Sequence, residues 1–155
     1  MILWVLIIVL ICVIILLTIY IRLLMKKAVF YFETTEKWHY NYDICSEWLQ
    51  YVEKGHTVRE YLDRFEYKSV AVWNLNPLGD LLIDKINREN ISLSFVIGNS
   101  EKKDCYGIPF ISEGDEVPLV DVIIVPSVFY FENIRSVLKE KTPSRIVCIR
   151  DIFCL

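Results

Sequence analysis

The chain has 155 residues, of which 54% are hydrophobic and 24% are charged, with a formal net charge of −3. This length fits one domain with one additional element and excludes two full domains. Residues 26–155 carry 16 Lys and Arg against 20 Asp and Glu, a net charge of −4. The negative balance argues against nucleic acid or an anionic surface as the main partner.

The first 21 residues contain no charged side chain, and Thr18 is the only clearly polar one. At about 1.5 Å per helical residue, this stretch spans roughly 30 Å, the thickness of a bilayer's hydrocarbon core. A signal peptide has a basic region before its apolar run, whereas this run starts at Met1 and is followed by Arg22. The pattern predicts a retained transmembrane helix over residues 1–25. The alternative is a helix buried in a globular protein, but no later segment has enough apolar surface to surround it.

Three cations, Arg22, Lys26 and Lys27, follow the apolar run. Positive charge favours the cytoplasmic side of a membrane helix, and Trp4 and Tyr20 lie where aromatic side chains anchor a helix at the two interfaces. We therefore expect a single-pass protein of the inner (cytoplasmic) membrane, with its N-terminus outside and its C-terminal domain in the cytoplasm.

Cysteine and histidine spacing gives no sign of a disulfide framework or a metal site. Cys12 falls in the predicted membrane helix, and the other four cysteines show neither close pairing nor metal-ligand spacing: Cys45, Cys105, Cys148 and Cys154. Both histidines, His39 and His56, lack a partner pattern and are expected to be ordinary surface residues. We expect reduced thiols and no metal.

Residues 26–66 are predicted to form a helical connector. An amphipathic helix is expected over residues 37–53, because apolar residues recur there at three- and four-residue spacings: Trp38, Ile44, Cys45, Trp48, Leu49 and Val52. Core packing is the favoured interpretation of this stripe, and contact with the membrane interface is the alternative. Gly55 should end the helix, and Thr57 with Glu60 forms a capping-box pattern for a short helix that ends near Phe65.

Beyond residue 66, short β-branched runs alternate with helical patterns. The predicted strands are Ser69–Trp73, Ile91–Ile97, Val120–Val125 and Arg145–Ile149, and the predicted helices cover Leu78–Ile86 and Phe129–Lys141. The run Val120–Val125 suits a central strand buried on both faces, as parallel sheets require. Residues 67–155 are therefore predicted to form an α/β domain with a doubly wound, mostly parallel, Rossmann-like sheet.

Four segments in this order carry a family resemblance: Lys68–Trp73, Leu78–Gly79, Tyr106–Pro109 and Val120–Val125. Over roughly residues 56–155, the chain resembles the Rossmann-like domains of bacterial surface-glycan synthesis. These include the domain that follows the membrane helices in nucleotide-sugar dehydratases of capsule synthesis, and the small domain fused to sugar acyltransferases and some glycosyltransferases. The resemblance implies a role in surface-polysaccharide biosynthesis.

The first strand–helix turn departs from a dinucleotide-binding turn, which needs Gly-x-Gly-x-x-Gly. Here Asn74–Gly79 reads Asn-Leu-Asn-Pro-Leu-Gly and keeps only the third glycine. Asn76 is predicted to be a helix N-cap and Pro77 a first-turn residue that removes one N–H donor from the anion site. Asp80 adds negative charge that repels phosphate. An empty structural turn is favoured over NAD binding, and no cofactor is expected.

A ligand crevice at this turn is the alternative, and its candidate residues are Asn74, Asn76, Gly79, Asn99 and Ser127. Asn99 follows the second strand, where it could hydrogen-bond a sugar, but that strand lacks the acidic residue that holds a ribose diol. Ser127 follows the buried strand, and a helix cap is its favoured role. Asp121 is placed inside that strand, either with a structural role or at its edge.

No catalytic residue is predicted, because the Tyr-x-x-x-Lys pair of the dehydratases, a Ser/His/Asp arrangement and a Walker loop are all missing from the sequence. The favoured hypothesis is a noncatalytic, membrane-anchored accessory or regulatory protein that holds a glycosyltransferase or another glycan-synthesis protein at the cytoplasmic face. The alternative is an enzyme or sensor that binds a nucleotide-sugar between residues 74–78 and 126–130. The sequence does not decide the polymer, the protein partner or the oligomeric state.

Overall fold

A computed structural model describes the backbone of residues 2–74, 77–98 and 107–154, and all side chains of these residues except those of 3, 5, 6, 8, 9 and 74. The chain forms two compact units, residues 1–39 and residues 40–155. Asn76 and Asn99, two of the predicted crevice residues, lie outside the described residues.

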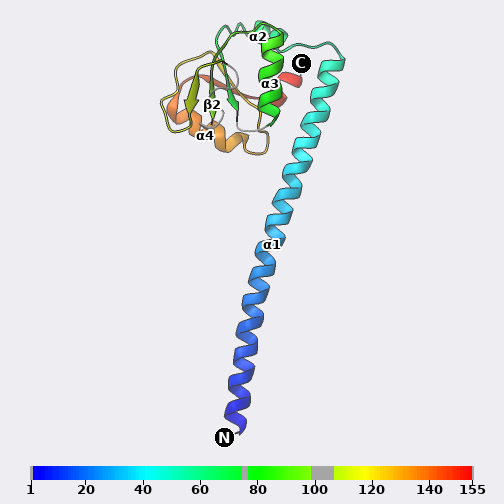
Figure 1. Ribbon diagram of the computed structural model, residues 1–155, viewed down its shortest axis with the longest axis vertical. Coiled ribbons are helices and arrows are strands. Elements are labelled where there is room, and N and C mark those ends of the chain that lie inside the picture. Colours follow the sequence, from blue (N-terminus) through cyan, green and yellow to red (C-terminus); the bar gives the residue numbers. More distant parts are fainter. Residues whose placement is uncertain (1, 75–76, 99–106, 155) are drawn as a thin grey trace. The chain divides into compact units, whose positions relative to one another are not determined.

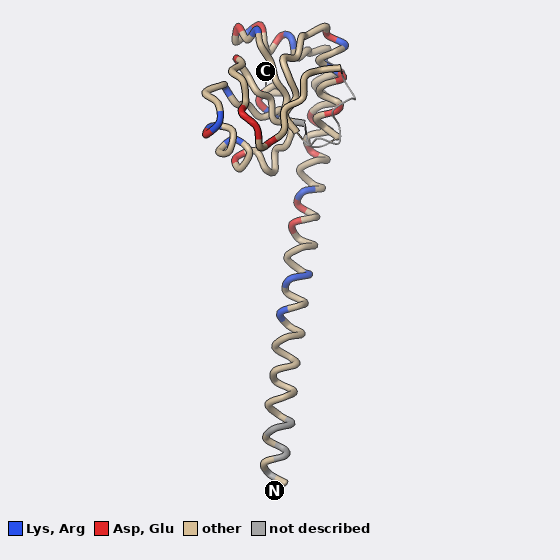
Figure 2. The backbone as a smooth tube through the Cα atoms, turned by 60° about the vertical axis from the view of Figure 1, so that its left-hand side comes forward, with Lys and Arg blue, Asp and Glu red and all other residues tan. Residues whose placement is uncertain are grey.

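The first element, α1, is one continuous helix over Ile2–Glu53 (Figure 1). No Gly or Pro interrupts residues 2–53, so nothing in the sequence separates the predicted apolar helix from the amphipathic helix that follows it. In Figure 2, the first turns of α1 carry no Lys, Arg, Asp or Glu. Within the part of the chain that the structure describes, no helix is both long and apolar enough to cross a membrane, so the transmembrane helix predicted over residues 1–25 is not confirmed.

The last turns of α1, from Tyr40, belong to the second unit. Ile44 and Tyr51 are buried in its core, and Trp48 packs against the same cluster. The predicted apolar stripe is therefore only partly right, because four of its members are exposed: Trp38, Cys45, Leu49 and Val52. The buried side also carries Glu47, whose carboxylate accepts two hydrogen bonds of 3.1 Å from the Arg150 guanidinium.

The second helix, α2, spans Val58–Arg64 and confirms the predicted capping box. The Thr57 hydroxyl accepts the Glu60 N–H at 3.2 Å, and the Glu60 carboxylate accepts the Thr57 N–H at 3.3 Å. Gly55 has φ +78°, and the adjacent His56 N–H donates to the Tyr51 carbonyl at 3.2 Å. This left-handed glycine ends α1 as predicted and turns the chain toward α2.

In the described part of the chain, five parallel strands form one sheet in the order β3-β2-β1-β4-β5. The strands are β1 (Val70–Asn74), β2 (Leu93–Gly98), β3 (Phe110–Ser112), β4 (Val122–Val125) and β5 (Arg145–Cys148). This α/β architecture with an all-parallel sheet is consistent with a Rossmann-like fold, as predicted. The sequence did not predict β3, which has three half-buried residues and pairs with β2.

Alternate residues of each central strand face two separate cores. Val70 and Val72 of β1 join the cluster that contains α3 (Pro77–Arg88), whereas Ala71 and Trp73 join the cluster that contains Leu138 of α4 (Phe131–Lys141). Helices thus cover both faces of the sheet, and the four residues of β4 are fully buried, as predicted for a central strand.

The helical patterns were correct in position and only partly correct in side-chain burial. In α3, Leu78, Leu82 and Ile86 are buried, but Leu81, whose helical spacing with them helped to predict the helix, is 49% exposed. Ile83 takes the buried position instead. A short helix that the sequence did not predict, α5 (Ile149–Phe153), follows β5 and buries Ile149 and Ile152.

Candidate functional site

The sheet order reverses at β1, which has β2 on one side and β4 on the other. In open parallel sheets, ligands bind at the carboxyl ends of the strands beside such a reversal. Here that edge is formed by Asn74, the last residue of β1, and by the segment after Val125 of β4. The structure therefore places two parts of the predicted crevice, residues 74 and 126–130, at the topological switch point.

The helix beside this edge begins as the sequence predicted. Pro77 is the first residue of α3, Gly79 is buried in its first turn, and Asp80 is in the same turn. Because Pro77 has no N–H and Asp80 is acidic, the N-terminus of α3 is poorly suited to a phosphate. The third glycine of the motif is thus retained for packing, without the features that bind pyrophosphate.

Ser127 lies two residues after β4 and is half-buried. The helix cap predicted for it is wrong, because α4 begins at Phe131 and its N-cap residue is Tyr130. Residues 128–130 form a bend and a turn between Ser127 and the helix, so the serine is too far back along the chain to bond the first N–H groups of α4. Ser127 remains a residue of the switch-point edge with no capping role.

Trp73, the residue before the end of β1, carries a buried polar group, the N–H of its indole ring. Its side chain is 5% exposed and lies in the cluster on the α4 face of the sheet. Within the described part of the chain, the indole Nε1 has no hydrogen-bond partner. A buried N–H without a partner costs about 1–3 kcal/mol, so it is a candidate group for a bound ligand. A tryptophan in a strand pattern gives no sequence signal for such a role.

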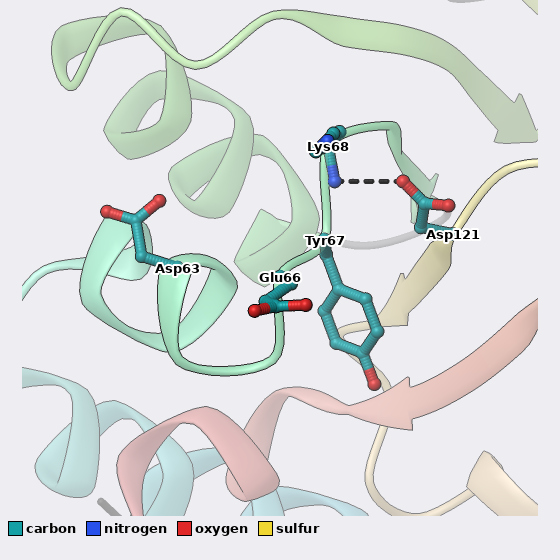
Figure 3. Close-up of a pocket in the computed structure, with 5 residues that line it drawn as sticks. All are labelled: Asp63, Glu66, Tyr67, Lys68 and Asp121. Carbon is teal, nitrogen blue, oxygen red and sulfur yellow. Dashed lines mark hydrogen bonds between the residues drawn. The ribbon is translucent and has the colours of Figure 1, made fainter.

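At the opposite edge of the sheet, where β1 and β4 begin, the surface has an open hollow of about 600 Å³ (Figure 3). Five residues line it: Asp63, Glu66, Tyr67, Lys68 and Asp121. Three of these five carry carboxylates, so the hollow is acidic. No local sequence pattern groups these residues, because they come from the end of α2 and from the two segments that lead into β1 and β4.

Asp121 has a structural task in this hollow. Its carboxylate accepts the backbone N–H groups of Lys68 and Ser69, each at 2.8 Å (Figure 3 shows the Lys68 bond). Hydrogen bonds from the N–H groups of Ser69 and Lys68, and from the Ser69 hydroxyl, hold the pKa of Asp121 below its ordinary value. Asp121 immediately precedes β4, which begins at Val122, so its predicted position inside the strand was wrong by one residue, whereas its predicted structural role agrees with these bonds.

Glu66 is in the hollow because α2 ends in a left-handed turn. Its φ is +58°, and the following Tyr67 N–H donates to the Leu62 carbonyl at 2.9 Å. This bond closes the C-terminus of α2 in the manner of a Schellman motif, a place that usually holds glycine. The side chains of Asp63 and Glu66 therefore project from the end of a short helix into solvent, and both are exposed.

A second hollow of about 300 Å³ lies beside the first and includes Arg59, Asn90 and Ser92. The Arg59 guanidinium donates to the carbonyls of Glu89 and Asn90 at 2.8 and 3.1 Å. The Arg59 N–H donates to the Glu89 carboxylate at 3.0 Å. These bonds tie the start of α2 to the end of α3, so the cation is used to hold two helices together.

The two hollows at this edge of the sheet, where β1 and β4 begin, offer few groups that could act on or hold a ligand. Among the described residues, no three His, Cys, Asp or Glu side chains lie close enough to hold a metal ion. Arg59 and Asp121 use their hydrogen bonds to join secondary-structure elements. We therefore regard this edge as structural and the switch-point edge as the candidate binding site.

Comparisons with protein-family models, with curated proteins and with solved structures found no match to this chain.

Proposed function

We propose that this protein is a membrane-anchored, noncatalytic Rossmann-like module that acts as an accessory or regulatory protein in surface-polysaccharide biosynthesis. The pathway rests on the sequence resemblance described above. The parallel sheet with its reversal at β1 supports a Rossmann-like module. The observation that carries the noncatalytic assignment is the start of α3, where Pro77 and Asp80 stand at the position that binds phosphate in nucleotide-binding relatives of the fold.

The membrane anchor is supported by the exposure of apolar side chains on α1. Between Leu10 and Met25, every large hydrophobic side chain is at least 46% exposed, on all sides of the helix. Proteins in water rarely expose apolar patches larger than a few hundred Å², whereas a bilayer solvates such a surface. With Arg22, Lys26 and Lys27 after this stretch, the proposal places the second unit at the cytoplasmic face.

Membrane fractionation tests the anchor. The full chain should pellet with membranes, resist extraction by carbonate and be released by detergent. A reporter fused after Leu155 should be active only in the form that functions in the cytoplasm. A chain that is extracted by carbonate, or a reporter that is active outside the inner membrane, would contradict the proposed localisation.

A calorimetric titration of the detergent-solubilised full chain tests the absence of a dinucleotide site. NAD(H) and NADP(H) should give no saturable heat near 1 mM, a concentration at which a site worth roughly 4 kcal/mol would be half filled. The accessory role further predicts that a membrane glycosyltransferase or another glycan-synthesis protein co-purifies with the full chain. Saturable dinucleotide binding would overturn the noncatalytic assignment.

A second candidate function is recognition of a nucleotide-sugar at the switch-point edge. It is favoured by the buried Trp73 indole, whose Nε1 has no partner among the described residues and which lies one residue before the end of β1. A ligand oxygen that accepted this N–H would remove the cost of its burial. The proposed ligand would therefore bind against the α4 face of the sheet.

The conservative variant Trp73→Phe separates the two functions. It removes the N–H while it keeps an aromatic ring in the core. If uridine or guanosine diphosphate-sugars bind the full chain, and Trp73→Phe weakens that binding about tenfold without loss of thermal stability, the nucleotide-sugar function is favoured. A flat titration with both sugars supports the accessory function.

A further inference from the structure

The second-unit part of α1 has an apolar side that no described residue covers. Four residues form it, and we call them the exposed stripe: Tyr42, Cys45, Leu49 and Val52. Tyr42 is 73% exposed, Leu49 63% and Val52 39%, and Cys45 is exposed as well. Each of these residues is apolar or weakly polar, so the stripe presents a hydrophobic surface to solvent.

This surface is separate from the side of the helix that packs in the core. Ile44, Trp48 and Tyr51 form the packed side. With 3.6 residues per turn, the exposed stripe lies about 110° around the helix axis from them. The fold of the second unit therefore uses one side of the helix and leaves the other available.

The spacing within the stripe is that of a coiled-coil seam. Residues 42, 45, 49 and 52 are separated by three, four and three positions, which is the alternation of the a and d positions of a heptad. Toward the N-terminus of α1, the next two d positions hold Trp38 and Tyr31, which are 71% and 67% exposed. The a position between them holds Thr35, whose hydroxyl donates to the Tyr31 carbonyl at 2.8 Å. A stripe of this length spans three heptads of one uninterrupted helix.

Charged residues are absent from the seam and, apart from Glu53 at its C-terminal end, from the positions beside it. Between Tyr31 and Leu49, the charged side chains all fall at other heptad positions: Glu33, Glu36, Lys37, Asp43 and Glu47. The other flanking positions hold uncharged residues: Phe32, Thr34, His39 (counted as neutral at pH 7), Asn41, Ser46 and Trp48. Trp48 packs against the core of the second unit, and in a parallel coiled coil Glu53 would face this position of the partner rather than another charge. Two identical stripes can therefore face one another without repulsion between like charges.

We propose that the exposed stripe binds a second copy of this chain, to form a parallel two-stranded coiled coil. Each aromatic residue of such a seam buries about 150–250 Å². The exposed stripe extended by Trp38 and Tyr31 contains three aromatic residues in each copy, so the seam would bury on the order of 1,000 Å², which a specific interface requires. The parallel orientation rests on the proposed membrane anchor, since two chains inserted with the same topology run in the same direction. The dimer itself rests on the stripe alone.

Cys45 provides a direct test, because a d position of a parallel coiled coil faces its own counterpart. The variant retains Cys45 and replaces the other four cysteines: Cys12→Ser, Cys105→Ser, Cys148→Ala and Cys154→Ser. Treated in isolated membranes with a short bis-maleimide, most of this full-length chain should migrate at twice its mass under reducing conditions. A matched control carries Cys45→Ser with Gln50→Cys, an exposed position off the seam, and should cross-link several-fold less.

A second variant pair tests the stripe without cross-linking. Leu49→Glu places a charge in the seam and should convert the detergent-solubilised dimer to monomer in analytical ultracentrifugation. Leu81→Glu, at an exposed leucine on α3, should leave the dimer intact. Equal cross-linking at positions 45 and 50, no cross-linking at Cys45, or a monomer for the unmodified chain would overturn the proposal. A stripe that lies against lipid would give no cross-link at Cys45. Membrane fractionation tests the anchor by itself, so failure of the anchor can be distinguished from failure of the dimer.

Discussion

Ser69 and Asp121 form a reciprocal hydrogen-bonded pair at the start of the two central strands. The Ser69 N–H donates to the Asp121 carboxylate at 2.8 Å, and the Asp121 N–H donates to the Ser69 hydroxyl at the same distance. In addition, the Val122 N–H donates to the Ser69 carbonyl at 3.2 Å. This pair begins the β1–β4 register, and that register sets the switch point at the other end of the same strands.

Replacing the half-buried Ser69 with Ala should lower the free energy of unfolding by about 1 kcal/mol, because the Asp121 N–H loses its acceptor. Urea denaturation followed by circular dichroism would measure the change. Ser92→Ala, at an exposed serine before β2, is the control and should leave the midpoint within error. A midpoint for Ser69→Ala equal to that of Ser92→Ala would show that the pair contributes nothing to stability.

The carboxylate of Asp121 should make the stability of the second unit depend on acidity. Backbone hydrogen bonds from Ser69 and Lys68 lower its pKa in the folded protein from the ordinary value of 3.8. Its contribution is therefore complete above about pH 4 and is lost as the pH falls through the lowered pKa. Thermal melts between pH 2 and pH 7 should show a shallower acid decline for Asp121→Asn than for the unmodified chain. Parallel declines would assign the acid sensitivity to other carboxylates.

Burial of Tyr61 should limit stability at alkaline pH. Burial, and after it the neighbouring Tyr67, raise the pKa of Tyr61 from 10.0 to about 12. The folded state therefore retains a proton that the unfolded state has lost, and stability falls as the pH rises from 10 toward 12. Tyr61→Phe should move alkaline unfolding to higher pH, although Tyr51, whose pKa is also raised by burial, will still contribute. Tyr130→Phe, at an exposed tyrosine just before α4, should not move it.

Glu66 should be replaceable by glycine with a gain in stability. Its φ of +58° lies in the left-handed region, which costs an L-residue about 1–2 kcal/mol, whereas glycine adopts it without steric cost. Glu66→Gly should raise the free energy of unfolding by about 1 kcal/mol, after the greater entropy of the unfolded glycine is included. Asn90→Gly is the matched control: its φ is +54°, but asparagine already tolerates this region, so the gain should be smaller. A destabilised Glu66→Gly would indicate that the glutamate side chain has a stabilising role.

A fragment of residues 40–155 should fold without the rest of α1, because Ile44, Trp48 and Tyr51 lie inside its boundary. A fragment of residues 57–155 lacks all three, and the loss of two buried side chains alone should cost about 4 kcal/mol. Urea denaturation of the two fragments would measure the difference. Equal midpoints would mean that the last turns of α1 are not part of the core.

The sequence by itself determined most of the local structure of the second unit. The short β-branched run at Ser69–Trp73 predicted a strand, and the hydrophobic run at Val120–Val125 predicted a central one. Thr57 and Glu60 predicted the start of α2, and Pro77 predicted the start of α3. These features are predictable because strand burial, capping and proline geometry depend on residues close together in the chain.

Only the tertiary structure decided which apolar residues are buried and which edge of the sheet holds which polar groups. The helix over residues 37–53 carries two apolar stripes, and spacing alone could not say that Ile44 and Tyr51 face the core while Cys45 and Leu49 face solvent. The bonds of Asp121 to Lys68 and Ser69 join residues more than 50 positions apart. Such contacts depend on which elements lie side by side, and that is set by strand order, which no local pattern encodes.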